Sequence, residues 1–409
     1  MPLRPLAPVL VALLAATVTA NAAERPAPSA LPPSPSDFVL QSIAKDDAPK
    51  AFSGTAAERR TRLAERAKGA YTHTFDLSGL PDYAPNGRLT GTIRVWGNNY
   101  VGDSGLAAAW RAAFQRHHPG VAFELVLPTA AVAVPALYFG LADIGMNHEP
   151  TFYDLLGHVR ILGCEPTGFS VVTGSFDISG WQNSFAIIVH KDNPLSRITM
   201  EQLDGVFGSA RAGGWVGTRW EPAFARGAEK NIRTWDQLGL TGGWAGKRLN
   251  LYGYSVRYAT ALEFSNRVLH GSDKWNEDIL AFGNYISPEG KRTLQAEEII
   301  SRMRADRHGI AYIRWQPGFA QDVKVLALAR DAAGPYFDFN VENVQARRYP
   351  LWGDQSFWVT RKPGARIEPR VEEFIRFVLS REGQELVMRD GKYLPLPAEV
   401  AREQLKKLD

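Results

Sequence analysis

The chain has 409 residues, of which 45% are hydrophobic and 22% are charged, a composition typical of a soluble globular protein long enough for about two domains. It contains 47 lysine and arginine residues against 43 acidic residues, and the formal net charge is +4. Because the basic residues are dispersed along the chain, nucleic acid is not expected as a partner. The single cysteine, Cys164, excludes an internal disulfide bond.

The first 22 residues predict a secretory signal peptide. Arg4 provides a positive charge, residues 9–18 (VLVALLAATV) form an apolar run, and Ala20-Asn21-Ala22 has the small-x-small form of a cleavage site. The apolar run is shorter than the roughly 20 residues of a membrane-spanning helix. Export to the periplasm is therefore favoured over membrane anchoring.

Residues 23–89 are expected to form a linker and an N-terminal extension. Residues 24–36 are rich in proline and serine, which is typical of an extended or disordered linker. Residues 56–68 have the pattern of a charged surface helix. Residues 75–83 (FDLSGLPDY) contain enough apolar side chains to pack on a folded core.

From residue 92 onward, strand and helix patterns alternate. Leu106, Trp110 and Phe114 share one face of a helix by the i, i+4 rule. The first block predicts strands at residues 92–96, 121–127 and 142–146. Between them it predicts a helix at residues 106–117 and a short helix at 132–141. This βαβαβ order indicates parallel strands joined by crossover helices.

A second alternating block follows and is expected to build a separate sheet, because two such blocks exceed one compact unit. Thr199 with Gln202 three residues later predicts a capping box at a helix start. The block predicts strands at residues 184–190, 249–252 and 309–314, and helices at residues 200–207, 258–269 and 295–306.

The C-terminal part returns to the first pattern, with a strand at residues 357–360 and helices at 370–379 and 380–390, the last capped by Ser380. Two α/β lobes with more than one chain crossing would leave a ligand cleft between them. The expected organisation is a signal peptide at residues 1–22 and the linker with the N-terminal extension at 23–89. Lobe 1 is expected at residues 90–180 and 347–409, and lobe 2 at 181–346.

Patterns of catalytic and metal-binding residues are absent from the sequence. No GxSxG, HExxH or GxxxxGK[ST] motif occurs, and the eight histidines show no metal-ligand spacing. We therefore expect no enzymatic activity, no cofactor and no metal. The pairs Glu372-Glu373 and Glu297-Glu298 are expected on solvated helix faces, and most of the 11 tryptophans in the core.

Five segments carry a family resemblance. They are residues 186–208 (AIIVHKDNPLSRITMEQLDGVFG), 231–242 (NIRTWDQLGLTG), 308–315 (HGIAYIRW), 347–359 (RRYPLWGDQSFWV) and 374–397 (FIRFVLSREGQELVMRDGKYLPLP). Together they resemble the phosphate-binding proteins of bacterial ABC importers, in consistent order over residues 90–397. The resemblance implies an α/β chain with a type II periplasmic-binding-protein fold, in which two lobes close on an oxyanion.

In that family the anion is held by backbone N–H groups and hydroxyls at helix N-termini, together with one arginine. Helix starts offer unpaired N–H donors and the positive end of the helix dipole, and arginine adds a bidentate, charge-assisted grip. The resemblance places the first anion loop at residues 97–105 (GNNYVGDSG), where Asn98, Asn99 and Ser104 can donate hydrogen bonds. The alternative is a solvent-facing turn in which Ser104 caps a helix.

The second and third loops keep fewer of the family's polar residues. In residues 128–132 (PTAAV) only Thr129 has a hydroxyl, and a helix cap is the alternative role. In residues 142–150 (ADIGMNHEP), Asn147 is the expected donor. His148 stands where some members carry a carboxylate that accepts a hydrogen bond from protonated phosphate and rejects sulfate; a structural or surface histidine is the alternative.

The fourth loop, residues 252–260 (YGYSVRYAT), departs furthest from the family. Tyr254 takes the position of the family's arginine. Arg257, three residues later, is the expected source of positive charge, with Tyr258 and Thr260 as donors. The alternative is that Arg257 is a solvated loop cation.

The resemblance therefore implies an exported, monomeric solute-binding protein that captures inorganic phosphate or a related oxyanion and delivers it to the permease of an ABC importer. Two alternatives stay open. One is a binding protein for another ligand, such as an organophosphate. The other is a secreted accessory, signalling or phosphatase-like protein on the same fold.

Overall fold

The computed structural model describes residues 69–286 and 292–408. All of them belong to one compact unit. Within the described ranges, no helix has both the length and the apolar character needed to cross a membrane.

The N-terminal predictions are tested only in part. The signal peptide, the proline-rich linker and the charged helix, predicted at residues 1–22, 24–36 and 56–68, lie outside the described residues. Residues 75–83 do pack on a core as expected, since Leu77 and Leu80 are buried in the same apolar cluster as the first sheet.

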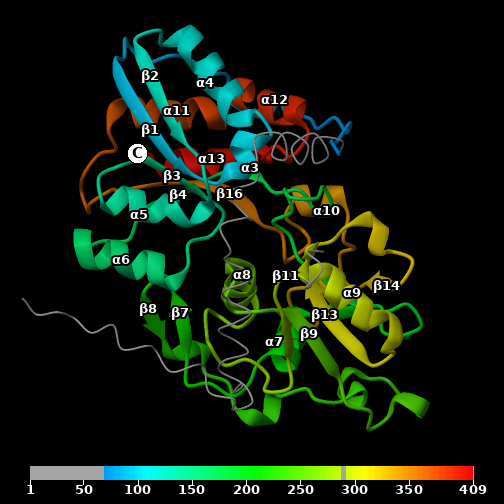
Figure 1. The fold of residues 1–409 in the computed structure, drawn as a ribbon. Coiled ribbons are helices and arrows are strands. Elements are labelled where there is room, and N and C mark those ends of the chain that lie inside the picture. The colour runs from blue at the N-terminus through cyan, green and yellow to red at the C-terminus, as the bar shows by residue number, and fades with distance from the viewer. Residues whose placement is uncertain (1–68, 287–291, 409) are drawn as a thin grey trace, which may run out of the picture. The chain divides into compact units, whose positions relative to one another are not determined.

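Five strands form the first sheet in the order β2-β1-β3-β16-β4 (Figure 1). β1 is parallel to β2 and β3, whereas β16 is antiparallel to β3 and β4. The strands are β1 Gly91–Gly97, β2 Val121–Val126, β3 Ile144–Asn147, β4 Thr167–Thr173 and β16 Asp354–Val359. The chain thus leaves this sheet after β4 and returns to it with β16.

Helices pack on both faces of this sheet, because side chains alternate between the faces along each strand. Ile93 and Val95 of β1 are buried against α4, α11, α12 and α13, while Trp96 of β1 and Trp358 of β16 pack against α5. We call this sheet and its helices the first lobe. The helices are α3 Asn99–Asp103, α4 Leu106–His117, α5 Ala133–Tyr138, α6 Phe152–Leu162, α11 Pro369–Leu379, α12 Arg381–Asp390 and α13 Ala398–Lys406.

The second sheet also has five strands, in the order β10-β9-β13-β5-β14. β9 is parallel to β10 and β13, and β5 is antiparallel to β13 and β14. The strands are β5 Ala186–His190, β9 Asn250–Tyr254, β10 Leu280–Phe282, β13 Gly309–Ile313 and β14 Val323–Val325. Short pairs join β6 Arg197–Thr199 to β15 Ala327–Ala329, β7 Gly214–Val216 to β8 Arg219–Glu221, and β11 Tyr285–Ile286 to β12 Arg292–Thr293.

This second sheet and its helices form what we call the second lobe. Its core is built on stacked aromatic rings, with the centroids of Phe264 and Tyr312 only 3.8 Å apart. Phe207 meets the same Tyr312 ring edge-on at 5.5 Å. The helices are α7 Met200–Phe207, α8 Ala259–Val268, α9 Gln295–Ala305 and α10 Val341–Gln345. The 3-10 turns among the described residues are at Ala130–Val132, Pro222–Phe224, Ala228–Lys230, Trp235–Leu238, Gly242–Trp244 and Pro317–Phe319.

Two predicted helix caps are confirmed. Thr199 Oγ1 accepts from Gln202 N at 3.1 Å and Gln202 Oε1 accepts from Thr199 N at 3.0 Å, which completes the capping box of α7. Ser380 Oγ accepts from Gly383 N at 3.3 Å at the start of α12. The predicted α/β architecture with two sheets is confirmed as well.

The prediction for the Glu372-Glu373 pair was wrong at one position. Glu373 is 5% exposed, and its Oε1 accepts from Tyr83 Oη at 2.8 Å and from Asn86 N at 3.1 Å. The physical reason is that the segment leading into β1 covers this face of α11. A helical pattern alone does not reveal such a cover.

Candidate functional site

Polar residues follow neighbouring strands at the carboxyl edge of the first sheet. β1 and β3 are parallel, with Gly97 paired to Met146, so their carboxyl ends lie side by side. Asn98 N donates to Met146 O at 2.8 Å, and Asn147 pairs with Ser356 of β16. A Cβ at Gly97, where φ is 146°, would lie 2.0 Å from Met146 O, so this close approach requires glycine.

The two asparagines of the first predicted anion loop bond to protein atoms in this structure. Asn98 is 1% exposed; its Oδ1 accepts from Tyr100 N at 2.9 Å and its Nδ2 donates to Gln355 Oε1 at 2.9 Å. Asn99 Nδ2 donates to Asp103 Oδ2 at 3.1 Å. Gln355 Nε2 is buried and has no hydrogen-bond partner among the described residues, so it is a further donor at this edge.

The hydroxyls of Ser104 and Thr129 differ in their bonding. Ser104 Oγ donates to Val101 O at 3.2 Å and accepts from Leu106 N at 3.2 Å. The alternative role as a helix N-cap is wrong, because Gly105 is the N-cap residue of α4 and Ser104 ends α3. Thr129 precedes the 3-10 turn at Ala130–Val132, is half-buried, and makes no side-chain capping bond there. An anion contact by Ser104 would therefore compete with its local bonds.

At the carboxyl edge of the second sheet, Tyr254 ends β9 and Arg314 directly follows the parallel strand β13. Tyr254 is 2% exposed, and burial raises the pKa of its phenol to about 12. Its Oη accepts from Arg314 N at 2.7 Å. Tyr254 therefore brings no charge to the position where the family has its arginine, but it supports an arginine immediately beside it.

The helix α8 begins at the same edge, after the loop that follows β9. Tyr258 is its N-cap residue, and its Oη accepts from Asn284 N at 3.1 Å. Arg257 is exposed, with its backbone N–H donating to Ser255 Oγ at 3.4 Å, and Thr260 is half-buried in the first turn. The first turn of this helix supplies N–H groups without intrahelical partners.

A cluster of charged side chains joins the two carboxyl edges. Glu263 of α8 is 2% exposed, and its carboxylate accepts a hydrogen bond from Arg314 Nη2. His148, which follows β3 in the first lobe, places Nδ1 3.1 Å from Glu263 Oε1, and Arg267 Nη2 lies 3.8 Å from Oε2. Burial alone would raise the pKa of Glu263, but Arg314, His148 and Arg267 outweigh it and lower the pKa to about 2.

Arg267 connects this cluster to both segments along which the chain passes between the lobes. Its Nε lies 3.2 Å from Glu149 Oε2, and Asn266 Nδ2 donates to Glu149 Oε1 at 3.1 Å. Its Nη1 donates to Asn183 O at 3.0 Å and to Trp352 O at 2.8 Å, on the two segments that link the lobes. Burial raises the pKa of the Glu149 carboxyl, and the charge of Arg267 opposes that rise.

The lobes also meet at the hairpin formed by β7 and β8. Glu165 Oε1, from the first lobe, accepts from Thr218 N and Thr218 Oγ1 at 2.6 Å each. The rings of Phe152 and Trp215 lie 4.8 Å apart between centroids. The arrangement of the two lobes is therefore held at two separate places.

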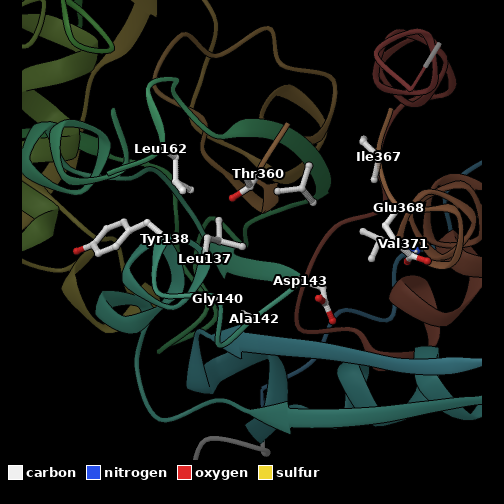
Figure 2. Close-up of a pocket in the computed structure, with 11 residues that line it drawn as sticks. Leu137, Tyr138, Gly140, Ala142, Asp143, Leu162, Thr360, Ile367, Glu368 and Val371 are labelled. Carbon is white, nitrogen blue, oxygen red and sulfur yellow. Dashed lines mark hydrogen bonds between the residues drawn. The ribbon is translucent and has the colours of Figure 1, made fainter. Parts of the chain in front are cut away.

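A pocket of about 280 Å³ lies at the other end of the first sheet (Figure 2). Leu137 and Leu162 are among its apolar walls, and Asp143 and Glu368 add carboxylates. Asp143 directly precedes β3 and pairs with Arg94 at 2.7 Å. Apolar walls and carboxylates disfavour an anion, and the position at the amino end of β3 separates this pocket from the charged cluster.

A family model described as a PBP superfamily domain matches residues 96–382. The chain therefore belongs to this superfamily.

Among curated proteins, the phosphate-binding protein PstS from two strains of Pseudomonas aeruginosa is 27% identical to the chain over 332 residues, which are 80% of the chain and 90% of that protein. Among solved structures, an ABC-type phosphate transport receptor from Vibrio cholerae is 15% identical, with 75% of this chain and 100% of that chain covered and a TM-score of 0.43. A possible phosphate binding protein from Planctomyces limnophilus is 17% identical, with 78% and 98% covered and a TM-score of 0.43. The resemblance found in the sequence is confirmed.

Sequence reasoning missed Arg314, Glu263 and Arg267, although each lies near a loop it did identify. One signal was present for Arg314: an arginine that directly follows an apolar strand stands at the carboxyl edge of the sheet. Glu263 and Arg267 have the i, i+4 spacing of a helical ion pair. That spacing does not point to a site, because their other partners, Arg314 and Glu149, are remote in sequence.

Proposed function

We propose that this protein captures phosphate or a related oxyanion between the carboxyl edges of its two sheets. The proposal is supported by membership of the PBP superfamily and by relatives that are named as phosphate-binding proteins. A solute held between two lobes contacts both, so its binding energy favours the closed arrangement.

The observation that carries the proposal is the position of Arg314. It follows β13, is supported by the buried Tyr254, and lies in the cluster that reaches His148 of the first lobe. Its Nη1 is buried and has no hydrogen-bond partner among the described residues, and a buried guanidinium nitrogen without an acceptor is costly. An oxyanion would supply that acceptor.

The proposed site combines this arginine with the residues predicted from the sequence. Arg257 remains a candidate for charge compensation, since it stands at the start of α8. The proposed hydrogen-bond donors are Asn98, Asn99, Ser104, Thr129, Asn147, Tyr258 and Thr260. Several of them bond to protein atoms now, so their participation requires local rearrangement on binding.

We further propose that the protein is exported, works as a monomer in the periplasm and delivers its anion to an ABC importer permease without performing catalysis. This part of the proposal is supported by the N-terminal sequence pattern and by the likeness to the phosphate-binding protein PstS.

A thermal-shift panel on the full chain, freed of bound anion, tests the proposal. Phosphate, sulfate, molybdate and phosphate esters are compared, because a bound ligand raises the melting temperature by mass action. Phosphate is expected to give a saturable rise. A larger response to an ester would instead support the organophosphate alternative, and hydrolysis of the ester would support a phosphatase-like protein.

Variants of the two candidate arginines test which of them supplies the positive charge that contacts the anion. Loss of a charge-assisted bidentate contact costs about 1.5–3 kcal/mol, or roughly 10- to 100-fold in Kd. Arg314→Met is expected to weaken phosphate binding by this amount, and Arg257→Met tests the sequence-based candidate. Arg302→Met, which removes a surface arginine of α9, is the matched control. If no anion shifts the wild-type melting temperature, the proposal is wrong.

A further inference from the structure

The arginine proposed to bind the solute already holds an anion that belongs to the protein. The Glu263 carboxylate accepts from Arg314 Nη2, and its side chain is 3% exposed. His148 Nδ1 lies at 3.1 Å and Arg267 Nη2 at 3.8 Å from the same carboxylate. Three potential cations therefore converge on one carboxylate between the carboxyl edges of the two sheets.

The geometry of α8 directs this carboxylate toward the proposed site. Glu263 lies four residues after the first residue of α8, Ala259, and side chains on a helix point back toward its N-terminus. Glu263 thus already bonds to the arginine that a solute anion would use.

The formal charges of the cluster already cancel. Arg314 and Arg267 contribute two positive charges, and Glu263 and Glu149 contribute two negative charges, with His148 adding charge only when protonated. An incoming anion therefore meets no excess of arginine charge. It also meets a carboxylate, and two anions at hydrogen-bond distance of the same guanidinium repel each other.

We propose that Glu263 is an internal counter-anion that competes with the solute for Arg314, so that a bound anion displaces the carboxylate from that guanidinium. The proposal rests on the anion-binding function proposed above. It makes Glu263 an affinity-setting residue: the competing carboxylate lowers the affinity of the protein for its anion, while it pairs with the half-buried Arg314 when the anion is absent.

Calorimetric titration of the full chain with inorganic phosphate tests this competition. Glu263→Gln keeps the size of the side chain and a hydrogen-bonding oxygen but removes the charge. It is expected to lower the Kd for phosphate by about tenfold or more. The matched control is Glu298→Gln, which removes one negative charge from an ion pair with Arg302 on the surface of α9, and it is expected to change the Kd by less than about twofold.

The outcomes separate this inference from the proposed function. Phosphate binding by Glu263→Gln that is tighter than wild type, or that appears only in the variant, supports both. Binding by wild type with equal or weaker binding by the variant overturns the counter-anion and leaves the proposed function intact. Absence of binding in wild type and in both variants overturns the proposed function and the inference with it.

A second measurement does not depend on the variant folding. In a crystal structure of the wild-type protein with bound phosphate, the Glu263 carboxylate is expected beyond 3.5 Å from both terminal nitrogens of Arg314, the limit of a hydrogen bond. A carboxylate that still bonds to Arg314 while phosphate is bound would overturn the proposal.

Discussion

The ion pair between Glu263 and Arg314 predicts a strong energetic coupling in the anion-free protein. Removing one partner of a buried pair costs about 3–5 kcal/mol, because the other charge stays buried without compensation. Here Arg267 and His148 still contact Glu263, so we expect about 2–3 kcal/mol for Arg314→Met. For Glu263→Gln, which keeps an acceptor oxygen, we expect about 1–2 kcal/mol.

The double variant distinguishes a real pair from two independent residues. Arg314→Met with Glu263→Gln leaves neither charge uncompensated, so the combined cost is expected to fall about 1–2 kcal/mol below the sum of the single costs. Urea unfolding at pH 7, followed by circular dichroism without added anion, measures all three differences. Additive costs, with a coupling below about 0.5 kcal/mol, would refute the reasoning.

Three further predictions concern the same elements. Gly97→Ala places a Cβ 2.0 Å from Met146 O and is expected to destabilise the protein by about 2–4 kcal/mol, seen as a lower urea midpoint; an unchanged midpoint would contradict the close approach. The pKa of Glu263 is lowered from 4.5 to about 2, so its stabilising contribution is complete above pH ~4.5 and is lost as the pH falls toward 2. The difference in unfolding free energy between wild type and Glu263→Gln should therefore shrink over that interval. A difference that stays constant would contradict the pKa shift. Ser380→Ala removes the acceptor for Gly383 N and is expected to cost about 1 kcal/mol in the same unfolding assay, whereas Ser380→Asp, which keeps a capping oxygen, should cost less.

Periodic segments of the sequence were sufficient to predict β1, β2, β3 and β16 of the first sheet and β5, β9 and β13 of the second. The sheet strands β4, β10 and β14 and the helices α6 and α13 were not predicted. The capping box at Thr199 fixed the start of α7 correctly, because a cap depends only on neighbouring residues. The three-residue strands β7 and β8 were missed, since three residues are too few for an alternation to be recognised. Their turn contains Gly217 at a φ of 60°, a local feature that in retrospect favours a hairpin.

The site was less predictable than the fold, because its charges are paired through tertiary contacts. Arg257, the cation singled out from the sequence, is exposed beside α8, whereas the half-buried arginines Arg314 and Arg267 take partners from other elements. Glu373 illustrates the same point in the first lobe, where its partner Tyr83 comes from the segment before β1. Which charged side chain becomes buried depends on the packing of distant segments, and no local pattern encodes it.

The most direct test of the central claim is calorimetric titration of the anion-free, full-length protein with inorganic phosphate, in parallel with Arg314→Met. The account predicts saturable binding of one phosphate per chain in the wild type, and binding at least about tenfold weaker in the variant. Absence of heat up to millimolar phosphate, or equal affinity in the two proteins, would contradict it.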